Sequence, residues 1–517
     1  MADVILTGTV VTMDEARPVI DEGAVYVAGG RVVAVRARTD RPPEGFDGAR
    51  RVATRGVIYP GLVDMHSHMA YNTLPLWSAA GVPYAHHDRW PSEKREPPYS
   101  TAVSWPAKVL GQAAAEALIK YVEVKALIGG TTALQGAPRT TRAVRGWLVR
   151  IVDTEDFGTG TDRVLCSALQ RSVEKLRTDA VTLRDGRVLI YHMAEGLPGS
   201  LVHREFTELD AGGCLQPGLI GVHATALKPE DFAHWQAKVR AAGGDQRGTV
   251  VWSPFSNLWL YHDTTDVAAA HAKGMRIALG SDWSPSGTKH VLGELKVADA
   301  VNRDRFGGVF SDAELCAMAT ANAGDALAVA YPQNRIGRLR DGAEADLLVL
   351  ERHHDDPHRN LIEATERHVR LVMVRGDPFY GTPGLMTATG APGGDAVRVA
   401  GRSRVLVVRR PGQADATMNW PQVVADLERV RADPAAAWRS SQDALAAWGG
   451  SLDDEDAPLA IFGDMPEGEL GLLGAAGEIP PGLVIPALDP ITHDKRFLAA
   501  VAASSAPHIG ELARYYS

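Results

Sequence analysis

The hydrophobic pattern divides the chain into three parts. Short β-branched runs separated by glycine turns fill the first sixty residues, and similar runs return near the other end. Between them, short apolar runs alternate with longer amphipathic stretches. The two strand-rich ends can pair with each other across the middle. The pattern therefore predicts one composite β domain from residues 1–58 and 335–410, and a central domain over residues 59–334.

The central part contains eight candidate strands. They span residues 61–66, 130–135, 147–152, 163–169, 188–193, 219–224, 249–254 and 276–281. Helical patterns lie between several of them, at 107–129, 229–243 and 265–274. The pattern of 147–152 also fits part of a helix. Strands that alternate with helices in this way predict an α/β fold with a parallel (β/α)₈ barrel.

Two further segments do not follow this alternation of strands and helices. A polar, aromatic-rich loop at 74–105 follows the first strand, and a loop of this length is often a lid or a binding loop. The tail at 411–517 has helical periodicity interrupted by an acidic turn and a proline-rich stretch. We expect a mainly helical C-terminal extension, which caps the barrel mouth, forms a subunit interface or packs on the β domain. The lone His493 and His508 within it are expected to be structural.

Composition and charge narrow the classes of partner and compartment. The 517 residues include 54 Lys+Arg and 63 Asp+Glu, for a net charge of −9, which argues against a nucleic-acid or anionic-membrane surface. Three widely spaced cysteines exclude a disulfide framework and fit a reducing compartment. The N-terminus lacks a signal-peptide pattern, and no apolar stretch reaches the length of about 18 residues that a membrane span needs. We expect a cytoplasmic protein.

Candidate chemistry gathers at the carboxyl ends of four predicted strands. His66 and His68 lie two residues apart, so their side chains face the same side. His192, His223 and Asp282 end three other strands. Taken singly, each of these residues is more often structural or turn-forming than catalytic. Together they lie at the carboxyl ends of predicted barrel strands, which form the active-site face of that architecture. Converging imidazoles and a carboxylate suit Zn²⁺, with Fe²⁺ or Mn²⁺ as alternatives.

A second carboxylate completes this group. Glu195 follows His192 by three residues and can turn back towards the same opening, where a carboxyl group can shuttle protons.

Six motifs in order resemble the amidohydrolase superfamily, in the branch of cytosine deaminase and the triazine hydrolases. They are PGLVDMHSH (60–68), HMAE (192–195), GVHA (221–224), TVVWSPFSN (249–257), ALGSDW (278–283) and IGRLRDGAEADLLVL (336–350). The resemblance covers roughly residues 1–410. It implies a distorted TIM barrel with a small β-sandwich built from both flanks of the barrel.

The resemblance also implies a role for each motif residue. The metal ligands would be His66, His68, His192 and Asp282. The catalytic residues would be Glu195 as proton shuttle, His223 beside the metal, and Asp282, which accepts a proton from the attacking water. Binuclear members add a carboxylated lysine on the fourth strand, but 163–169 has no lysine and Lys175 lies beyond it. We therefore expect one divalent ion, with Zn²⁺ favoured.

The expected substrate is a small, flat, polar heterocycle. Candidate binding residues are Tyr71, Asn72, Trp77, His86, Gln135 and Asn257, although the aromatic residues of the 74–105 loop can equally serve to pack a lid. Gln135 can equally satisfy backbone groups. Arg139 and Lys289 are expected to be solvated surface charges, with contact to an acidic substituent as the alternative.

The leading hypothesis for the reaction is hydrolytic deamination by metal-activated water. Opening of a cyclic amide, or displacement of chloride or an alkylamine from a ring, would use the same site. A non-catalytic scaffold on this fold is the alternative of another class. By resemblance the protein is expected to be a homo-oligomer.

Overall fold

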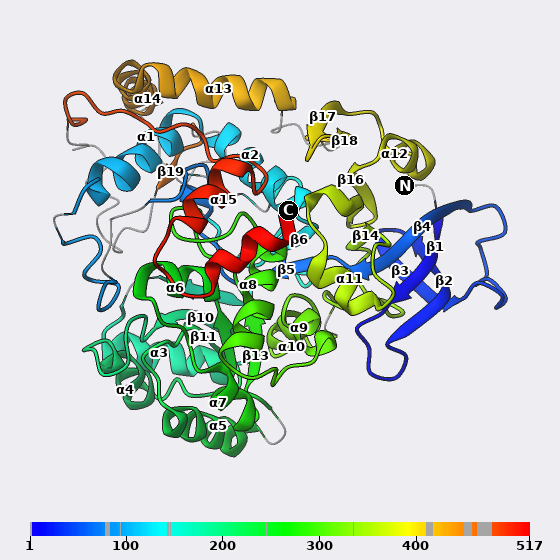
Figure 1. The fold of residues 1–517 in the computed structure, drawn as a ribbon, viewed down its shortest axis with the longest axis horizontal. Coiled ribbons are helices and arrows are strands. Elements are labelled where there is room, and N and C mark those ends of the chain that lie inside the picture. The colour runs from blue at the N-terminus through cyan, green and yellow to red at the C-terminus, as the bar shows by residue number, and fades with distance from the viewer. Residues whose placement is uncertain are drawn as a thin grey trace.

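A nine-stranded sheet and a helix-rich part with two parallel sheets make up the protein (Figure 1). The computed structural model describes residues 3–77, 83–93, 95–141, 144, 146–168, 170–243, 246–333, 335–409, 417–448, 458–462 and 478–516. Strands β1 to β4 lie at one end of the molecule, and the helices of the central part lie at the other (Figure 1).

The large sheet joins the two ends of the chain. Its strands are β1 (Val4–Val11), β2 (Val19–Ala28), β3 (Arg31–Ala37), β4 (Arg50–Pro60), β14 (Leu347–Glu351), β15 (Val369–Val374), β16 (Asp377–Gly381), β17 (Asp395–Val399) and β18 (Arg402–Leu406). Their order is β17-β18-β16-β15-β14-β4-β1-β2-β3. The two flanks meet where β4 pairs antiparallel with β14, with Pro60 opposite Leu347. This pairing places the end of β4 directly before the motif with His66.

All eight predicted strand segments of the central part contain a strand. A three-stranded parallel sheet holds β5 (Leu62–Asp64), β6 (Thr131–Leu134) and β8 (Arg150–Ile151). A five-stranded parallel sheet holds β9 (Val164–Ser167), β10 (Val188–Met193), β11 (Leu219–His223), β12 (Thr249–Trp252) and β13 (Arg276–Leu279). Beyond β5 and β13, the amide of Asp282 donates to the carbonyl of His66 at 2.8 Å. In the described part of the chain, no strand pairing joins β8 to β9.

Helices surround these strands. In the central part they are α1 (Trp105–Ala113), α2 (Ala115–Ile128), α3 (Val173–Arg184), α4 (His203–Gly212), α5 (Pro229–Gly243), α6 (Pro254–Tyr261), α7 (Val267–Ala272), α8 (Val291–Asp304), α9 (Asp312–Met318) and α10 (Ala321–Leu327). Two more helices lie in the chain between strands of the large sheet, α11 (Pro357–Glu363) between β14 and β15 and α12 (Pro383–Thr389) between β16 and β17. The single helical pattern predicted at 107–129 is divided in the structure. Ala114, at φ −149° and ψ 44°, leaves the helical conformation and separates α1 from α2.

Residues beyond 411 pack on the central helices. They form α13 (Trp420–Ala432), α14 (Pro434–Trp448), α15 (Lys495–Ala502), the 3₁₀ helix η5 (Ile509–Tyr516) and the short strand β19 (Ile461–Phe462), which pairs with β7 (Arg139–Thr140). Helix α13 contacts α2, α14 contacts α1, and η5 contacts α8. Their apolar side chains belong to the same hydrophobic core as the large sheet and helices α1 and α2.

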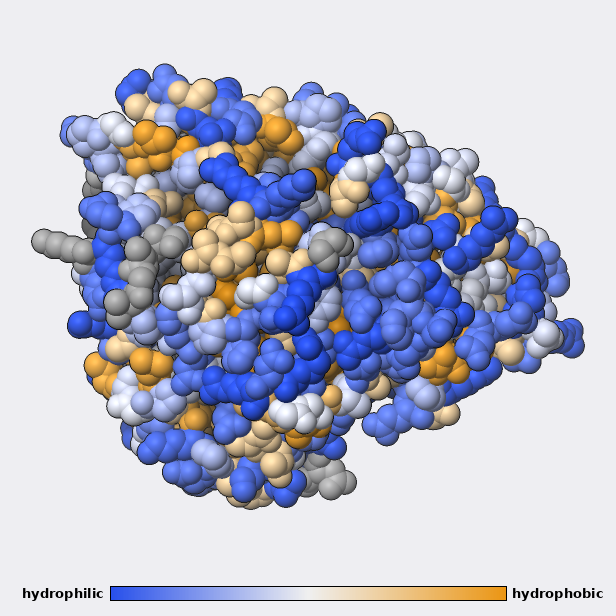
Figure 2. Space-filling model, viewed as in Figure 1, coloured by the Kyte–Doolittle hydropathy of each residue, from blue (hydrophilic) through white to orange (hydrophobic). Residues whose placement is uncertain are grey.

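The outer surface is mainly polar. Figure 2 shows hydrophilic residues over most of one face, with hydrophobic residues in smaller patches between them. Among the described helices, none is both long and apolar enough to cross a membrane.

A buried arginine links the central part to the large sheet. Arg150 in β8 is 2% exposed and pairs with Asp346 at 2.6 Å, with Glu344 at 2.7 Å and with Glu155 at 2.9 Å. Asp346 directly precedes β14. The guanidinium helps to compensate all three charges, while Glu155 also pairs with Arg375 at 2.6 Å and Glu344 with Arg31 at 3.3 Å.

Replacing Arg150 should therefore weaken the whole fold. We expect Arg150→Met to lower the free energy of unfolding by about 3–5 kcal/mol, because three carboxylates lose their shared buried partner. Urea unfolding followed by circular dichroism measures this change. The matched control is Arg38→Met, which removes an exposed pair with Glu22 at 3.1 Å and should cost less than about 1 kcal/mol. Equal losses in the two variants would contradict a linking role for Arg150.

Candidate metal centre

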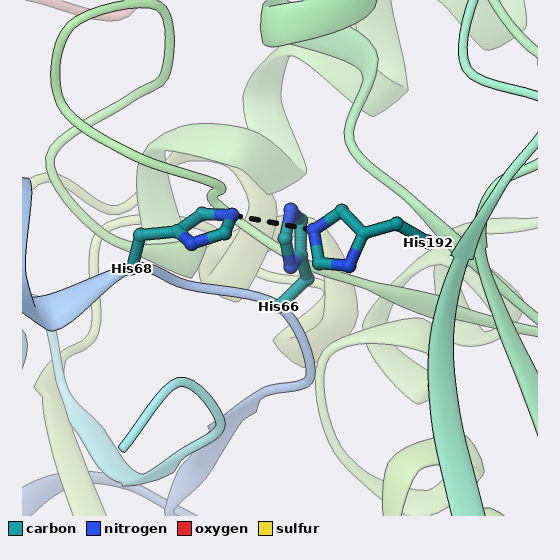
Figure 3. Close-up of side chains that lie close together, drawn as sticks. All are labelled: His66, His68 and His192. Carbon is teal, nitrogen blue, oxygen red and sulfur yellow. Dashed lines mark hydrogen bonds between the residues drawn. The ribbon is translucent and has the colours of Figure 1, made fainter. Parts of the chain in front are cut away.

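Three histidines from two strand ends point at one another (Figure 3). His66 and His68 follow β5, and His192 lies at the end of β10. The Nε2 atoms of His68 and His192 are 3.2 Å apart, and the ring centroids of His66 and His192 are 4.5 Å apart. One nitrogen from each ring lies within 4.8 Å of the others, so the three rings can share one cation.

The carboxylate of Asp282 and a fourth imidazole, that of His223, lie beside the three histidines. Asp282 Oδ1 lies 3.0 Å from His66 Nε2 and 3.6 Å from His68 Nε2. Asp282 Oδ2 lies 4.0 Å from His223 Nε2. The structure thus brings together side chains from the ends of β5, β10, β11 and β13, as the motif order led us to expect.

The chemistry of this donor set fits a metal ion. His66 is fully buried, and neither of its ring nitrogens has a hydrogen-bond partner, although Nε2 faces Asp282. Buried nitrogens normally have partners, and a cation would supply one. Ligands about 2.0–2.1 Å from a tetrahedral zinc ion lie about 3.3 Å from one another. The spacings of 3.0, 3.2 and 3.6 Å between the facing atoms are of this size.

The backbone at the site adopts conformations that side chains rarely take. His223 has φ 64° and Asp282 has φ 60°, both in the left-handed region. Such conformations cost free energy and are concentrated at functional sites. Gly280 permits the close approach of β13 to β5, because a Cβ atom there would lie 2.3 Å from the Cβ of His66.

Asp64 holds the ends of β5 and β13 together, and sequence reasoning missed this residue. Its Oδ2 accepts from the Ser281 hydroxyl at 2.5 Å, and its Oδ1 accepts from the Ser281 amide at 2.9 Å. Burial raises the pKa of Asp64 to about 7. The signal was available, since Asp64 lies two residues before His66 and therefore on the same side of the strand.

His223 presents a defined nitrogen to the site. Asn257 Oδ1 faces the hydroxyls of Thr264 and Thr265, at 3.4 and 3.5 Å, which leaves its NH₂ group towards His223 Nδ1 at 3.0 Å. Nδ1 must then accept, so the neutral ring carries its proton on Nε2. Burial lowers the pKa of His223 to about 3 and keeps the ring neutral.

The N–H of His223 faces both acidic groups of the site. Its Nε2 is 3.7 Å from Glu195 Oε2. Tyr261, which sequence reasoning also missed, donates its hydroxyl to Glu195 Oε1 at 2.7 Å. Burial raises the pKa of Glu195 to about 7. For Asp282, burial alone would raise the pKa, but the facing His66, His223 and His68 hold it below its ordinary value.

The loop at 74–105 reaches Glu195 through His87. The His87 amide donates to the carbonyl of Glu195 at 3.1 Å, and its Nε2 pairs with Glu205 Oε1 at 2.8 Å. Glu205 Oε2 in turn accepts from the Ala194 amide at 2.6 Å. Burial opposes protonation of His87, but the hydrogen bond to Glu205 and the charge of Glu195 raise its pKa to about 9.

The predicted substrate-binding residues lie in different environments. Tyr71 is half-buried, with its ring centroid 6.3 Å from that of His68 and 5.4 Å from that of Trp283, edge-on to both. His86 forms a β-bridge with Gly196. Trp77 stacks on Tyr84 at 6.1 Å between ring centroids.

The amide side chains among these candidates are bonded within the protein. Asn72 donates to Ser67 Oγ and accepts from the Ser284 amide, both at 2.8 Å. Gln135 donates to Asp153 Oδ1 at 3.1 Å. Asn257 faces His223, as described above. Contact of any of these residues with a substrate stays a prediction.

One expectation is wrong. Lys289 is not a solvated surface charge, because its ammonium group is buried and pairs with Asp489. Arg139 is exposed, as expected.

Comparison with known proteins finds a family match and distant relatives. Residues 187–379 match the Amidohydrolase family. A 5-methylthioadenosine/S-adenosylhomocysteine deaminase of Symbiobacterium thermophilum is 25% identical over 397 residues, which are 69% of this chain and 87% of that protein.

Solved structures share the fold. An adenosine deaminase from Xanthomonas campestris with bound zinc is 18% identical, with a TM-score of 0.59 over 85% of this chain and 98% of that chain. A zinc complex of atrazine chlorohydrolase from Arthrobacter aurescens is 16% identical, with a TM-score of 0.55 over 83% of this chain and 99% of that chain.

Over residues 187–379 the chain resembles the Amidohydrolase family, in line with the six motifs. The protein is a metal-dependent hydrolase of the amidohydrolase type, acting on C–N bonds.

The raised pKa of His87 predicts a pH-dependent contribution to stability. The folded protein binds this proton more tightly than the unfolded chain does, because the pKa rises from 6.5 to about 9 on folding. The stabilisation is complete below pH 6.5 and is lost as the pH rises through about 9. We expect His87→Gln to lower the free energy of unfolding by about 2 kcal/mol more at the acidic end of this window than at the alkaline end.

Urea unfolding at a series of pH values measures this difference. His234→Gln is the control, because His234 also faces a carboxylate, Asp210 at 2.8 Å, but is exposed. It should change stability little at any pH. A cost of His87→Gln that does not vary with pH would contradict the assignment.

Proposed function

We propose that this protein is a zinc-dependent deaminase that hydrolyses the exocyclic amino group of a heterocycle, with adenine nucleosides as the substrate class. The convergence of His66, His68, His192 and Asp282, with Glu195 and His223 alongside, carries the proposal. The similarity to a deaminase of 5-methylthioadenosine and S-adenosylhomocysteine supports the substrate class.

A single zinc ion would be held by His66, His68, His192 and Asp282. When bound, such an ion lowers the pKa of water towards about 7 and so supplies a nucleophile at neutral pH. One ion is favoured over two because β9 reads Val-Leu-Cys-Ser and offers no lysine, while Lys175 lies in α3. The zinc-containing structures of the same fold support the choice of metal.

Asp282 would accept the proton of the attacking water. Its carboxylate is kept ionised by three facing imidazoles, and its Oδ2 is directed towards His223. The proton can then pass to Glu195. Both carboxylates face His223 Nε2, at 3.7 Å for Glu195 and 4.0 Å for Asp282, so they border the same part of the site.

Glu195 would deliver a proton to the substrate. A carboxyl group with a pKa of about 7 exchanges protons readily at neutral pH, and Tyr261 fixes its orientation by donating to Oε1. Protonation of the leaving nitrogen allows it to depart as ammonia. His223 would stabilise developing negative charge with the N–H that Asn257 directs into the site.

Aromatic rings next to these groups suit a flat substrate. Trp283 follows Asp282 directly and contacts Tyr71, Trp90 and Tyr99, at ring-centroid distances of 5.4, 5.2 and 6.1 Å. Its ring also lies 6.3 Å from that of His68. Such rings provide apolar contact for a heterocycle close to the metal ligands.

The finer architecture is part of the same proposal. The two parallel sheets would together form a distorted barrel over residues 59–334, open between β8 and β9, with 1–58 and 335–410 as a β-sandwich and 411–517 as an extension. The association of copies into a homo-oligomer stays a prediction.

Ammonia release from a panel of substrates tests the reaction. We expect the zinc-loaded protein to release ammonia from 5-methylthioadenosine or adenosine, and protein treated with a chelator to lose this activity until zinc is restored. Chloride release from a chlorotriazine, or ring opening of a cyclic amide, without ammonia release from any nucleoside would contradict the deaminase proposal and favour the other reactions of the same site.

Replacing Glu195 tests its role separately from metal binding. We expect Glu195→Gln to lower kcat by about 10²–10⁴-fold while the zinc content is unchanged, because the proton carrier is lost but no ligand is removed. Steady-state kinetics and elemental analysis measure the two quantities. Glu230→Gln, a change of the same kind at an exposed position of α5, is the control and should leave both unchanged. Full activity of Glu195→Gln would exclude Glu195 as the shuttle.

A further inference from the structure

A carboxylate of the C-terminal segment lies buried against the central part. Asp489 is 1% exposed and belongs to the stretch before α15. Its Oδ2 pairs with the ammonium of Lys125 at 2.5 Å, and its Oδ1 pairs with the ammonium of Lys289. Both lysines are buried, so two positive charges depend on one carboxylate.

Lys125 also binds the two loops that carry metal ligands. Its ammonium donates to the carbonyl of Asn72 at 2.9 Å and to Ser284 Oγ at 2.7 Å. Asn72 follows the loop of His66 and His68, and Ser284 follows Asp282 by two residues. The ammonium thus uses its three donors on Asp489 and on one group from each loop.

The side chain of Asn72 joins the same two loops directly. Its NH₂ group donates to Ser67 Oγ at 2.8 Å, and its Oδ1 accepts from the Ser284 amide at 2.8 Å. Ser67 lies between His66 and His68. The Asp489 amide also donates to the carbonyl of Thr73 at 2.8 Å, which adds a backbone contact at the same point.

Removal of the Asp489 charge would disturb this arrangement in a definite way. Lys125 and Lys289 would then be two buried ammonium groups without a counter-charge, and repulsion and desolvation would drive them apart or towards water. Lys125 cannot move without releasing Asn72 and Ser284. The effect would be transmitted to the positions of His68 and Asp282.

We propose that Asp489 is a positioning residue for the metal centre, which acts through Lys125 on the loops that hold the ligands. This inference rests on the proposed metal site. It gives the C-terminal extension a part in the active site, because the candidate ligands themselves, His66, His68, His192 and Asp282, all come from the central part of the chain. Outer residues that orient metal ligands typically change metal affinity about 10–100-fold when they are replaced.

A second buried anchor of the extension lies at the far end of the loop after β13, where Lys289 and His290 precede α8. His493 and His290 share Glu366 Oε1, at 2.7 and 3.2 Å. Their other ring nitrogens accept from backbone amides, His493 Nε2 from Lys289 at 3.2 Å and His290 Nδ1 from Gly293 at 3.3 Å. Every ring nitrogen is engaged, so this cluster is an anchor and not a second metal site. His493 is structural, as expected from the sequence.

Zinc affinity of the full-length protein tests the proposal. The variants are Asp489→Asn, Lys125→Met and the double variant, and the measurement is competition for Zn²⁺ with a coloured chelator. We expect each single variant to bind Zn²⁺ about 10–100-fold more weakly, and the double variant to resemble the singles, because both act through one contact. The absorption bands of the Co²⁺-loaded protein should change with the ligand geometry.

A matched control removes a different anchor of the extension. Tyr515 donates its hydroxyl to Asp299 in α8 at 2.6 Å, and within the described residues it makes no hydrogen bond to the ligand loops. Tyr515→Phe should leave Zn²⁺ affinity and the Co²⁺ spectrum unchanged. Should Asp489→Asn or Lys125→Met fail to fold, Ser284→Ala removes only one hydroxyl and should still weaken Zn²⁺ binding by at least about threefold and alter the Co²⁺ spectrum.

The outcomes separate the two proposals. A wild-type protein that binds no Zn²⁺ would overturn the metal site itself. A wild-type protein that binds Zn²⁺, with folded Asp489→Asn, Lys125→Met or Ser284→Ala of equal affinity and identical Co²⁺ spectrum, would overturn the role of Asp489 alone. Additive losses in the double variant would show that Asp489 does not act through Lys125.

Discussion

The arrangement of the site depends on His66, which is fully buried, with Nε2 3.0 Å from Asp282 Oδ1 and Nδ1 without a hydrogen-bond partner. Such a residue is costly unless a partner compensates it, and here the neighbours are two imidazoles and a carboxylate at ligand spacing. A cation between them would supply the missing partner. The strained backbone at His223 and Asp282 and the close approach of Gly280 to His66 then follow, because all serve to bring strand ends to one point.

Buried polar and charged side chains next to this point hold the strand ends in place. Asp64 binds the segment after β13, Asn257 fixes the tautomer of His223, and Lys125 binds the loops that carry His68 and Asp282 with the help of Asp489. Each of these groups is itself buried and hydrogen-bonded within the protein, so its position is determined by its partners. A site built in this way is preorganised, and its ligands need little rearrangement to bind a cation.

The sequence predicted the features that have a local signal. Apolar runs marked all eight central strands, and the histidines and Asp282 followed because they end those runs. The roles of Tyr261, His87 and Asp489 had no such signal, since each depends on a partner more than sixty residues away, such as Glu195 for Tyr261 and Lys125 for Asp489. Lys289 was mistaken for a surface charge for the same reason. The break at Ala114 was missed because its alanine-rich surroundings favour a continuous helix.

Anomalous X-ray diffraction at the zinc absorption edge tests the central claim most directly. In crystals of the zinc-supplemented protein, the account predicts one anomalous peak about 2.0–2.2 Å from a nitrogen of His66, His68 and His192 and from an oxygen of Asp282. A peak elsewhere, or none in well-ordered crystals with these side chains in the same positions, would contradict it.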